Sequence, residues 1–161
     1  MKKTDRISEF VKELAPSEAS GEALFDARYL GYFTCFNRGD YYEAHDVLED
    51  LWLKTTDADY AFYKGLIQIA GAFVHLRKQF ERPNHPKDGR RLAPATRLFD
   101  LGIANIEPFA PHHHRLDIAA FIRFCAKNRD AICESGYKIN PWSPSALPKL
   151  RLESSEVPIF L

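Results

Sequence analysis

The chain of 161 residues lacks the features that mark secreted and membrane-spanning proteins. It contains only three cysteines, Cys35, Cys125 and Cys133, and no Cys-x-x-Cys pair. We therefore expect buried free thiols in a reducing compartment, rather than a disulfide framework or a thiolate zinc site. No run reaches the ~18 apolar residues that a membrane span needs. The polar first residues also lack the apolar stretch of a signal peptide, so we expect a cytoplasmic protein without a membrane anchor.

Net charge is another absence, because 22 basic residues balance 22 acidic ones. The charges are unevenly placed: residues 40–59 hold seven acids and one base, and residues 77–97 hold seven bases and two acids. We expect these stretches to complement each other at the surface. No nucleic-acid motif and no exposed aromatic series accompanies the basic stretch, which argues against nucleic-acid binding.

The sequence also lacks the motifs of common nucleotide-binding proteins, serine hydrolases and zinc proteases, namely GxxxxGK[ST], GxGxxG, GxSxG and HExxH. These classes of enzyme are therefore not indicated, and the motifs leave open whether the protein is an enzyme at all.

Helical periodicity is what the chain has in place of these features. Hydrophobic residues make up 45% of the sequence, which is enough for one core. Apolar spacing at i, i+3, i+4 and i+7 predicts helices over about 4–14, from a cap at Ser17 or Ser20 to about 35, 41–54, 58–80, 91–105 and 117–134. We therefore predict one all-α domain over residues 1–161, a compact array of five or six helices.

The last residues, about 139–161, differ from the rest. Four prolines exclude a long helix there, and the apolar side chains between them are too numerous for a solvated tail. We predict an extended, proline-rich C-terminal arm that packs on the helical body or on a second copy of the chain. In the latter case the arm would be an interaction module that holds a homo-oligomer.

One polar cluster is the candidate functional site. His45 and Glu49 lie four residues apart at the edge of the apolar side of the predicted helix 41–54. Gln68 and His75 flank the apolar face of the next helix, seven residues apart. If the two helices are antiparallel neighbours, these four side chains converge beside Trp52.

Three interpretations of the cluster stay open. Polar side chains at the edge of a packed face often bond to one another, which would make the cluster structural, with or without a small-ligand pocket. His45, Glu49 and His75 form a normal ligand set for a divalent metal such as zinc or iron. A histidine paired with a glutamate could also act in acid–base catalysis. The other acids of this helix are expected to serve elsewhere: Asp40 with Glu43 as a capping box, and Asp46 with Asp50 as solvated side chains.

A histidine triplet, His112 to His114, directly follows a segment with two prolines, Pro108 and Pro111. Consecutive residues of one strand or helix cannot all point at one ion. We therefore predict an exposed loop there that binds nickel adventitiously, rather than a built metal site.

Two segments resemble domain-of-unknown-function family 309. Residues 36–52 read FNRGDYYEAHDVLEDLW, and residues 65–75 read GLIQIAGAFVH. They are similar to the family pattern F-N-x-G-x-Y-[FY]-E-A-H-E-x-L-E-x-x-W followed by G-L-I-Q-x-A and a histidine. The resemblance implies a small helical fold and no established activity. Asp46 stands where the family has Glu, which shortens the reach of that carboxylate.

Overall fold

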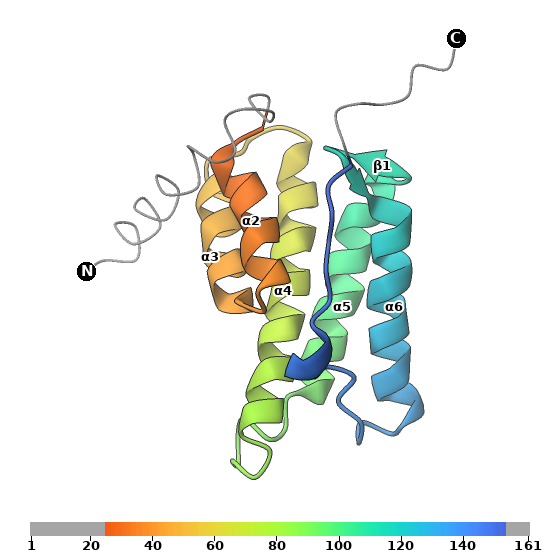
Figure 1. The fold of residues 1–161 in the computed structure, drawn as a ribbon. Coiled ribbons are helices and arrows are strands. Elements are labelled where there is room, and N and C mark those ends of the chain that lie inside the picture. The colour runs from red at the N-terminus through yellow and green to blue at the C-terminus, as the bar shows by residue number, and fades with distance from the viewer. Residues whose placement is uncertain (1–24, 154–161) are drawn as a thin grey trace, which may run out of the picture.

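The computed structural model describes residues 25–153, which form an array of five α-helices and an extended C-terminal segment (Figure 1). The helices are α2 (Ala27–Asn37), α3 (Tyr41–Trp52), α4 (Asp59–Glu81), α5 (Leu92–Ile106) and α6 (Ile118–Glu134). Each packs against the next in the chain. The predicted all-α array is therefore confirmed, while the helix predicted over residues 4–14 lies outside the described residues. Within residues 25–153 no helix is long and apolar enough to cross a membrane.

Most helix boundaries lie within a few residues of the predicted ones, and the caps explain the differences. Helix α2 begins at Ala27 rather than near Ser20, because Asp26 is its N-cap and accepts from the backbone N–H of Arg28. Asp117, where the last helix was predicted to begin, is the N-cap of α6 and accepts from the N–H of Ala120 at 2.9 Å.

The break between α2 and α3 also follows the sequence, with one correction. Gly39 has a φ of +79°, a conformation that favours glycine and ends α2. Asp40 occupies the N-cap position of α3, but its side chain makes no capping hydrogen bond. The predicted capping box is therefore wrong, and the Asp40 carboxylate lies 3.8 Å from the guanidinium of Arg77 instead.

Helix α4 is the central helix of the array. Its predicted apolar face is buried, and each of its five side chains is at most 1% exposed: Phe62, Leu66, Ile69, Phe73 and Leu76. The face has helical spacing, so one side of α4 enters the core shared with the other helices. On the side toward α2, the hydroxyl of Tyr32 donates to the carbonyl of Leu66 at 2.7 Å.

Helices α4 and α5 approach closely enough for their backbones to be in contact at two glycines. A Cβ added to Gly65 would lie 2.9 Å from the carbonyl oxygen of Gly102, and one added to Gly102 would lie 2.9 Å from that of Gly65. The absence of a side chain at Gly65 and Gly102 therefore lets α5 approach α4 this closely.

The described part of the C-terminal arm is extended and packs on its own chain, running alongside the helices (Figure 1). Its one helical turn is a 3₁₀ helix, Pro144–Ala146. The indole N–H of the buried Trp142 donates to the Tyr41 hydroxyl at 2.8 Å. The side chain of Asn37 binds both the N–H and the carbonyl of Leu150. The arm thus joins the end of α6 to α2 and α3, and residues 154–161 lie outside the described part.

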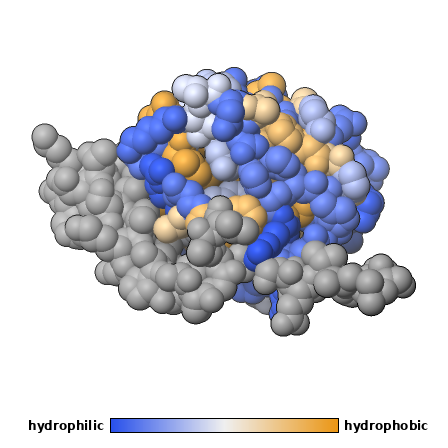
Figure 2. Space-filling view, turned by 90° about the horizontal axis from the view of Figure 1, so that it is seen from above, coloured by the Kyte–Doolittle hydropathy of each residue, from blue (hydrophilic) through white to orange (hydrophobic). Residues whose placement is uncertain are grey.

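The prediction of an exposed loop at the histidine triplet is wrong in part. After a 3₁₀ turn (Glu107–Phe109), a two-stranded antiparallel hairpin pairs β1 (His112–His113) with β2 (Leu116–Asp117). His112 is exposed as expected, but His113 and His114 are half-buried at 28% exposed. Figure 2 looks onto this end of the molecule, where α4 begins, and hydrophilic residues cover most of its coloured surface.

The three cysteines are free, as predicted. Cys35 and Cys125 are buried, and burial raises the pKa of the Cys35 thiol to about 12. Cys133 is exposed, so the expectation that all three thiols are buried is wrong for this residue.

The contact between α4 and α5 gives a first prediction. In Gly102→Ala the new methyl group would lie 2.6 Å from Cγ1 of Ile69 and 2.9 Å from the backbone of α4. We expect a loss of about 1–3 kcal/mol in the free energy of unfolding, measured by urea denaturation. Gly71→Ala is the matched control, because its methyl group meets only the end of the Leu98 side chain, at 3.1 Å. A Gly102→Ala variant as stable as Gly71→Ala would contradict the close approach.

Candidate functional site

His45 and Glu49 lie side by side on α3, as their spacing predicts. Nε2 of His45 is 3.7 Å from Oε2 of Glu49, and the two side chains are 32% and 26% exposed. They form a polar pair that solvent can reach.

The other ring nitrogen of His45 faces a carboxylate that the sequence analysis placed in solvent. Asp46 is only 4% exposed, and its Oδ1 lies 3.1 Å from Nδ1 of His45. Nδ1 of His45 can donate to this carboxylate, while Nε2 is the ring nitrogen that faces Glu49. Asp46 therefore belongs to the candidate site, and the prediction that it is solvated is wrong.

Trp52 lies at the C-terminal end of α3 and is partly buried against the core. Its ring packs on that of Tyr60, with centroids 5.1 Å apart. The indole Nε1 is buried and has no hydrogen-bond partner among the described residues. Trp52 thus forms an aromatic wall at one end of α3.

Gln68 turns toward α5. Its side-chain oxygen accepts a hydrogen bond of 2.7 Å from the amide of Asn105. This bond joins α4 to α5 a short distance along the helix from the contact at Gly65. The partner of Gln68 is therefore on α5, and the sequence analysis had expected it on α3.

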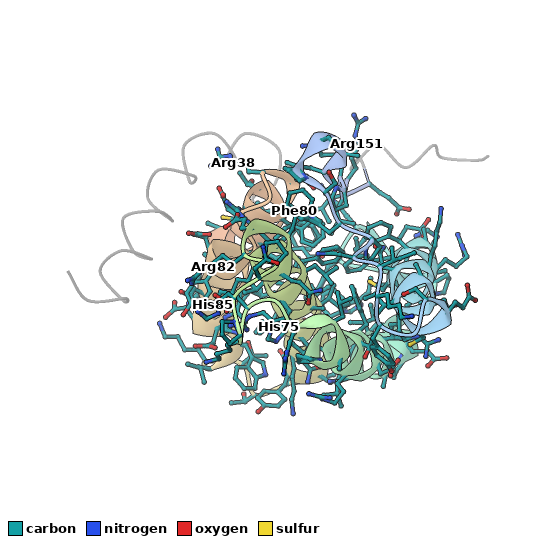
Figure 3. The ribbon with its side chains drawn as sticks, turned by 90° about the horizontal axis from the view of Figure 1, so that it is seen from below. Arg38, His75, Phe80, Arg82, His85 and Arg151 are labelled. Carbon is teal, nitrogen blue, oxygen red and sulfur yellow. The ribbon has the colours of Figure 1, made fainter. Side chains whose placement is uncertain are left out.

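His75 also faces a partner that comes after α4 in the chain. Its Nδ1 lies 3.0 Å from a guanidinium nitrogen of Arg91, which is held in turn by Asp88. Burial, together with the charge of Arg91, lowers the pKa of His75 to about 4. Figure 3 shows His75 in the last part of α4, with Arg82 and His85 from the loop that follows this helix. His75 is therefore a neutral acceptor at neutral pH.

The structure brings together only part of the predicted cluster. His45 and Glu49 meet, whereas Gln68 and His75 each bind a residue that follows α4. Three-residue groups with metal-ligating atoms within 4.8 Å of one another occur at the hairpin in residues 25–153, and none contains His45, Glu49 and His75 together.

An open groove of about 470 Å³ lies beside His45, between the start of α3 and the second half of α4. Tyr42 links the two, because it lines the groove and its ring is stacked with that of His45. Acids and bases share the lining, among them Glu43, Arg77 and Lys78. The groove was not predictable from the sequence, since its residues come from two helices and show no common motif.

The two charged stretches meet less than expected. Arg77 reaches from the basic stretch to Asp40, but it also binds Glu81 at 2.6 Å on its own helix. Arg82 and Arg91 both bind Asp88, which lies within the basic stretch itself. Much of the positive charge is therefore neutralised locally rather than by α3.

Comparison with known proteins agrees with the resemblance seen in the sequence. Residues 29–83 match the family model described as Domain of unknown function (DUF309), so this part of the chain is a DUF309 domain. The matched segment contains all five candidate residues. No curated protein and no solved structure matches the chain.

The depressed pKa of His75 gives a prediction for stability against pH. In the unfolded chain this imidazole takes up its proton near pH 6.5, and in the folded protein only near pH 4. Between these values the unfolded state binds more protons, so stability is full above pH 6.5 and falls as the pH is lowered. His75→Gln keeps an acceptor for Arg91 but cannot take up a proton. We therefore expect this variant to lose less unfolding free energy than wild type on acidification, by on the order of 1–2 kcal/mol after allowance for solvent screening.

The measurement is urea denaturation of both proteins at intervals from pH 7.5 to pH 4. His112→Gln is the control, since His112 is exposed in the hairpin. If wild type and His75→Gln lose stability in parallel on acidification, the neutral state assigned to His75 is wrong.

Proposed function

We propose that this DUF309 domain binds a divalent metal cation through His45 and Glu49. The observation that carries the proposal is the row Asp46–His45–Glu49, in which a buried carboxylate faces one ring nitrogen and an accessible carboxylate lies near the other.

The separation of the two ligand atoms suits a bridging cation. Metal bonds to imidazole nitrogen and carboxylate oxygen are ~2.0–2.2 Å long. Nε2 of His45 and Oε2 of Glu49 are 3.7 Å apart. At these bond lengths, the angle at the cation between its bonds to the two atoms would be about 120°. This is within the normal range for divalent cations, and water would fill the remaining positions.

Asp46 supplies the support that histidine ligands usually have. A metal-bound imidazole commonly directs its other N–H to a carboxylate, which fixes the ring and raises its basicity. Asp46 occupies that position at Nδ1 of His45. Because Asp46 is buried, it acts by positioning His45 rather than by touching the cation.

The local charge of α3 favours a cation as the ligand. Glu43, Asp46, Glu49 and Asp50 all lie on this helix. Arg28 and Lys54 contact Asp50 and offset part of this negative charge. A metal ion between His45 and Glu49 would experience a net attraction.

The other members of the predicted cluster receive supporting roles in this proposal. Gln68 holds α5 to α4 through Asn105, and Trp52 walls one end of α3. His75 is excluded as a ligand at Nδ1, because a cation there would compete with the guanidinium of Arg91. The proposed ligand set is therefore narrower than the set of His45, Glu49 and His75.

The test is calorimetric titration of Zn²⁺ into untagged protein that has been purified without metal resin and treated with chelator. We expect His45→Ala and Glu49→Gln each to abolish one equivalent of bound Zn²⁺. Asp46→Asn should retain that equivalent with affinity weakened about 10- to 100-fold, since a supporting carboxylate orients a ligand without replacing it. His75→Gln is the matched control and should bind Zn²⁺ as wild type does.

Stability of the same variants without metal separates this proposal from a purely structural contact. A structural pair predicts that His45→Ala binds as much Zn²⁺ as wild type and loses about 1–3 kcal/mol of unfolding free energy, because a partner is left unsatisfied. That pair of results would overturn the proposal.

A further inference from the structure

A second group of potential ligands lies at the other end of α4, where it meets the hairpin. Nε2 of His113 lies 2.7 Å from one carboxylate oxygen of Asp59, and Nε2 of His114 lies 2.7 Å from the other. The ligand atoms of all three residues lie within 4.8 Å of one another. Two imidazoles from one segment thus converge on a carboxylate more than fifty residues away in the sequence.

The turn of the hairpin explains how consecutive histidines point at one place. His113 is the last residue of β1 and pairs with Leu116, so His114 and Arg115 form a two-residue turn. Both have positive φ, 46° and 63°, as a type I′ turn requires. Glycine or asparagine is usual at such positions. The left-handed backbone at His114 removes the alternation of a strand and brings its ring onto the side of His113.

Aromatic side chains hold both imidazoles in place. His113 packs between Phe62 and Phe109, with ring centroids 4.7 Å away in each case. On the other side, Tyr29 donates from its hydroxyl to the backbone carbonyl of His114 at 2.8 Å. The three ligand residues are themselves partly shielded, at 22–28% exposed. The rings are therefore positioned by the fold, unlike those of a free surface loop.

We infer that Asp59, His113 and His114 form a binding site for a divalent transition-metal cation, separate from the proposed site at His45 and Glu49. Two imidazole nitrogens and one carboxylate oxygen are a normal protein ligand set for zinc and for ferrous iron, with positions left for water. His112 is not part of the set, because its Nδ1 faces Glu153 at 2.8 Å.

Binding requires a small adjustment of the distances. Ligand atoms around a tetrahedral cation at ~2.0–2.1 Å lie about 3.3 Å apart. The observed separations of 2.7 Å are those of hydrogen bonds, so the ligands would move apart by roughly 0.6 Å as the cation replaces the imidazole protons. The rotatable side chains of His114 and Asp59 allow this movement without a change in the helix.

The charges around the site also permit a cation. The start of α4 carries a partial positive charge from its free N–H groups, which opposes metal binding. Asp57 accepts from the N–H of Asp59 and places a second carboxylate there. The site is therefore anionic enough for a divalent ion.

The test uses full-length, untagged, chelator-treated protein with Zn²⁺ and Co²⁺ as probes. We expect Asp59→Asn and His113→Asn each to weaken one equivalent of bound Zn²⁺ at least tenfold in calorimetric titration. The same two variants should lose part of the visible absorption of bound Co²⁺. His45→Ala should leave this equivalent unchanged, so the two sites succeed or fail independently.

Asp59→Asn distinguishes a built site from adventitious capture by three neighbouring histidines. If it binds as tightly as wild type, and binding is lost only when all three histidines are replaced, the proposal is overturned. His112→Asn is the matched control within the hairpin. It should still bind the equivalent of Zn²⁺ that Asp59→Asn weakens.

A measurement on the unaltered protein guards against variants that fail to fold. In nitrogen-15 spectra of the imidazole rings, Zn²⁺ should shift Nε2 of His113 and His114 and leave that of His112 in place. Equal shifts of all three rings, or no shift, would overturn the inference.

Discussion

The contact of α4 with α5 at Gly65 and Gly102 is the constraint on which the arrangement of polar residues depends. At each glycine the backbone of the other helix lies so close that a methyl group in place of the hydrogen would clash with it. Because the two helices are fixed this closely, side chains on the same flank of α4 meet residues on α5 or at its N-terminal end. Gln68 finds Asn105 for this reason, and His75 finds Arg91 just before the first turn of α5.

This constraint divides one predicted cluster between two sides of α4. On the α3 side, His45 lies between the carboxylates of Asp46 and Glu49. On the α5 side, the polar contacts are an amide pair and an imidazole that is kept neutral by burial and by a guanidinium. The first group is partly exposed to solvent, while the amide pair of the second joins α4 to α5. Residues that look equivalent in a motif therefore have different physical roles.

The sequence predicts well whatever depends on spacing within one helix. The buried face of α4, the pairing of His45 with Glu49 and the cap at Asp117 all follow from positions a few residues apart. Periodicity assigns a face but not the helix that covers it, so the partners of Gln68 and His75 were not predictable. The burial of Asp46 depends on tertiary packing, whereas the charge of an aspartate predicts exposure to solvent. The hairpin was missed because its turn residues, His114 and Arg115, carry no glycine or asparagine signal.

Charge placement reinforces the division between the two sides of α4. The basic stretch was expected to neutralise α3, but Arg82 and Arg91 bind Asp88 within their own stretch. Arg91 is thereby held next to His75, where its charge helps to lower the pKa of that imidazole. Two histidines of the same sequence motif thus lie in opposite electrostatic surroundings, because His75 lies beside a guanidinium and His45 lies between two carboxylates.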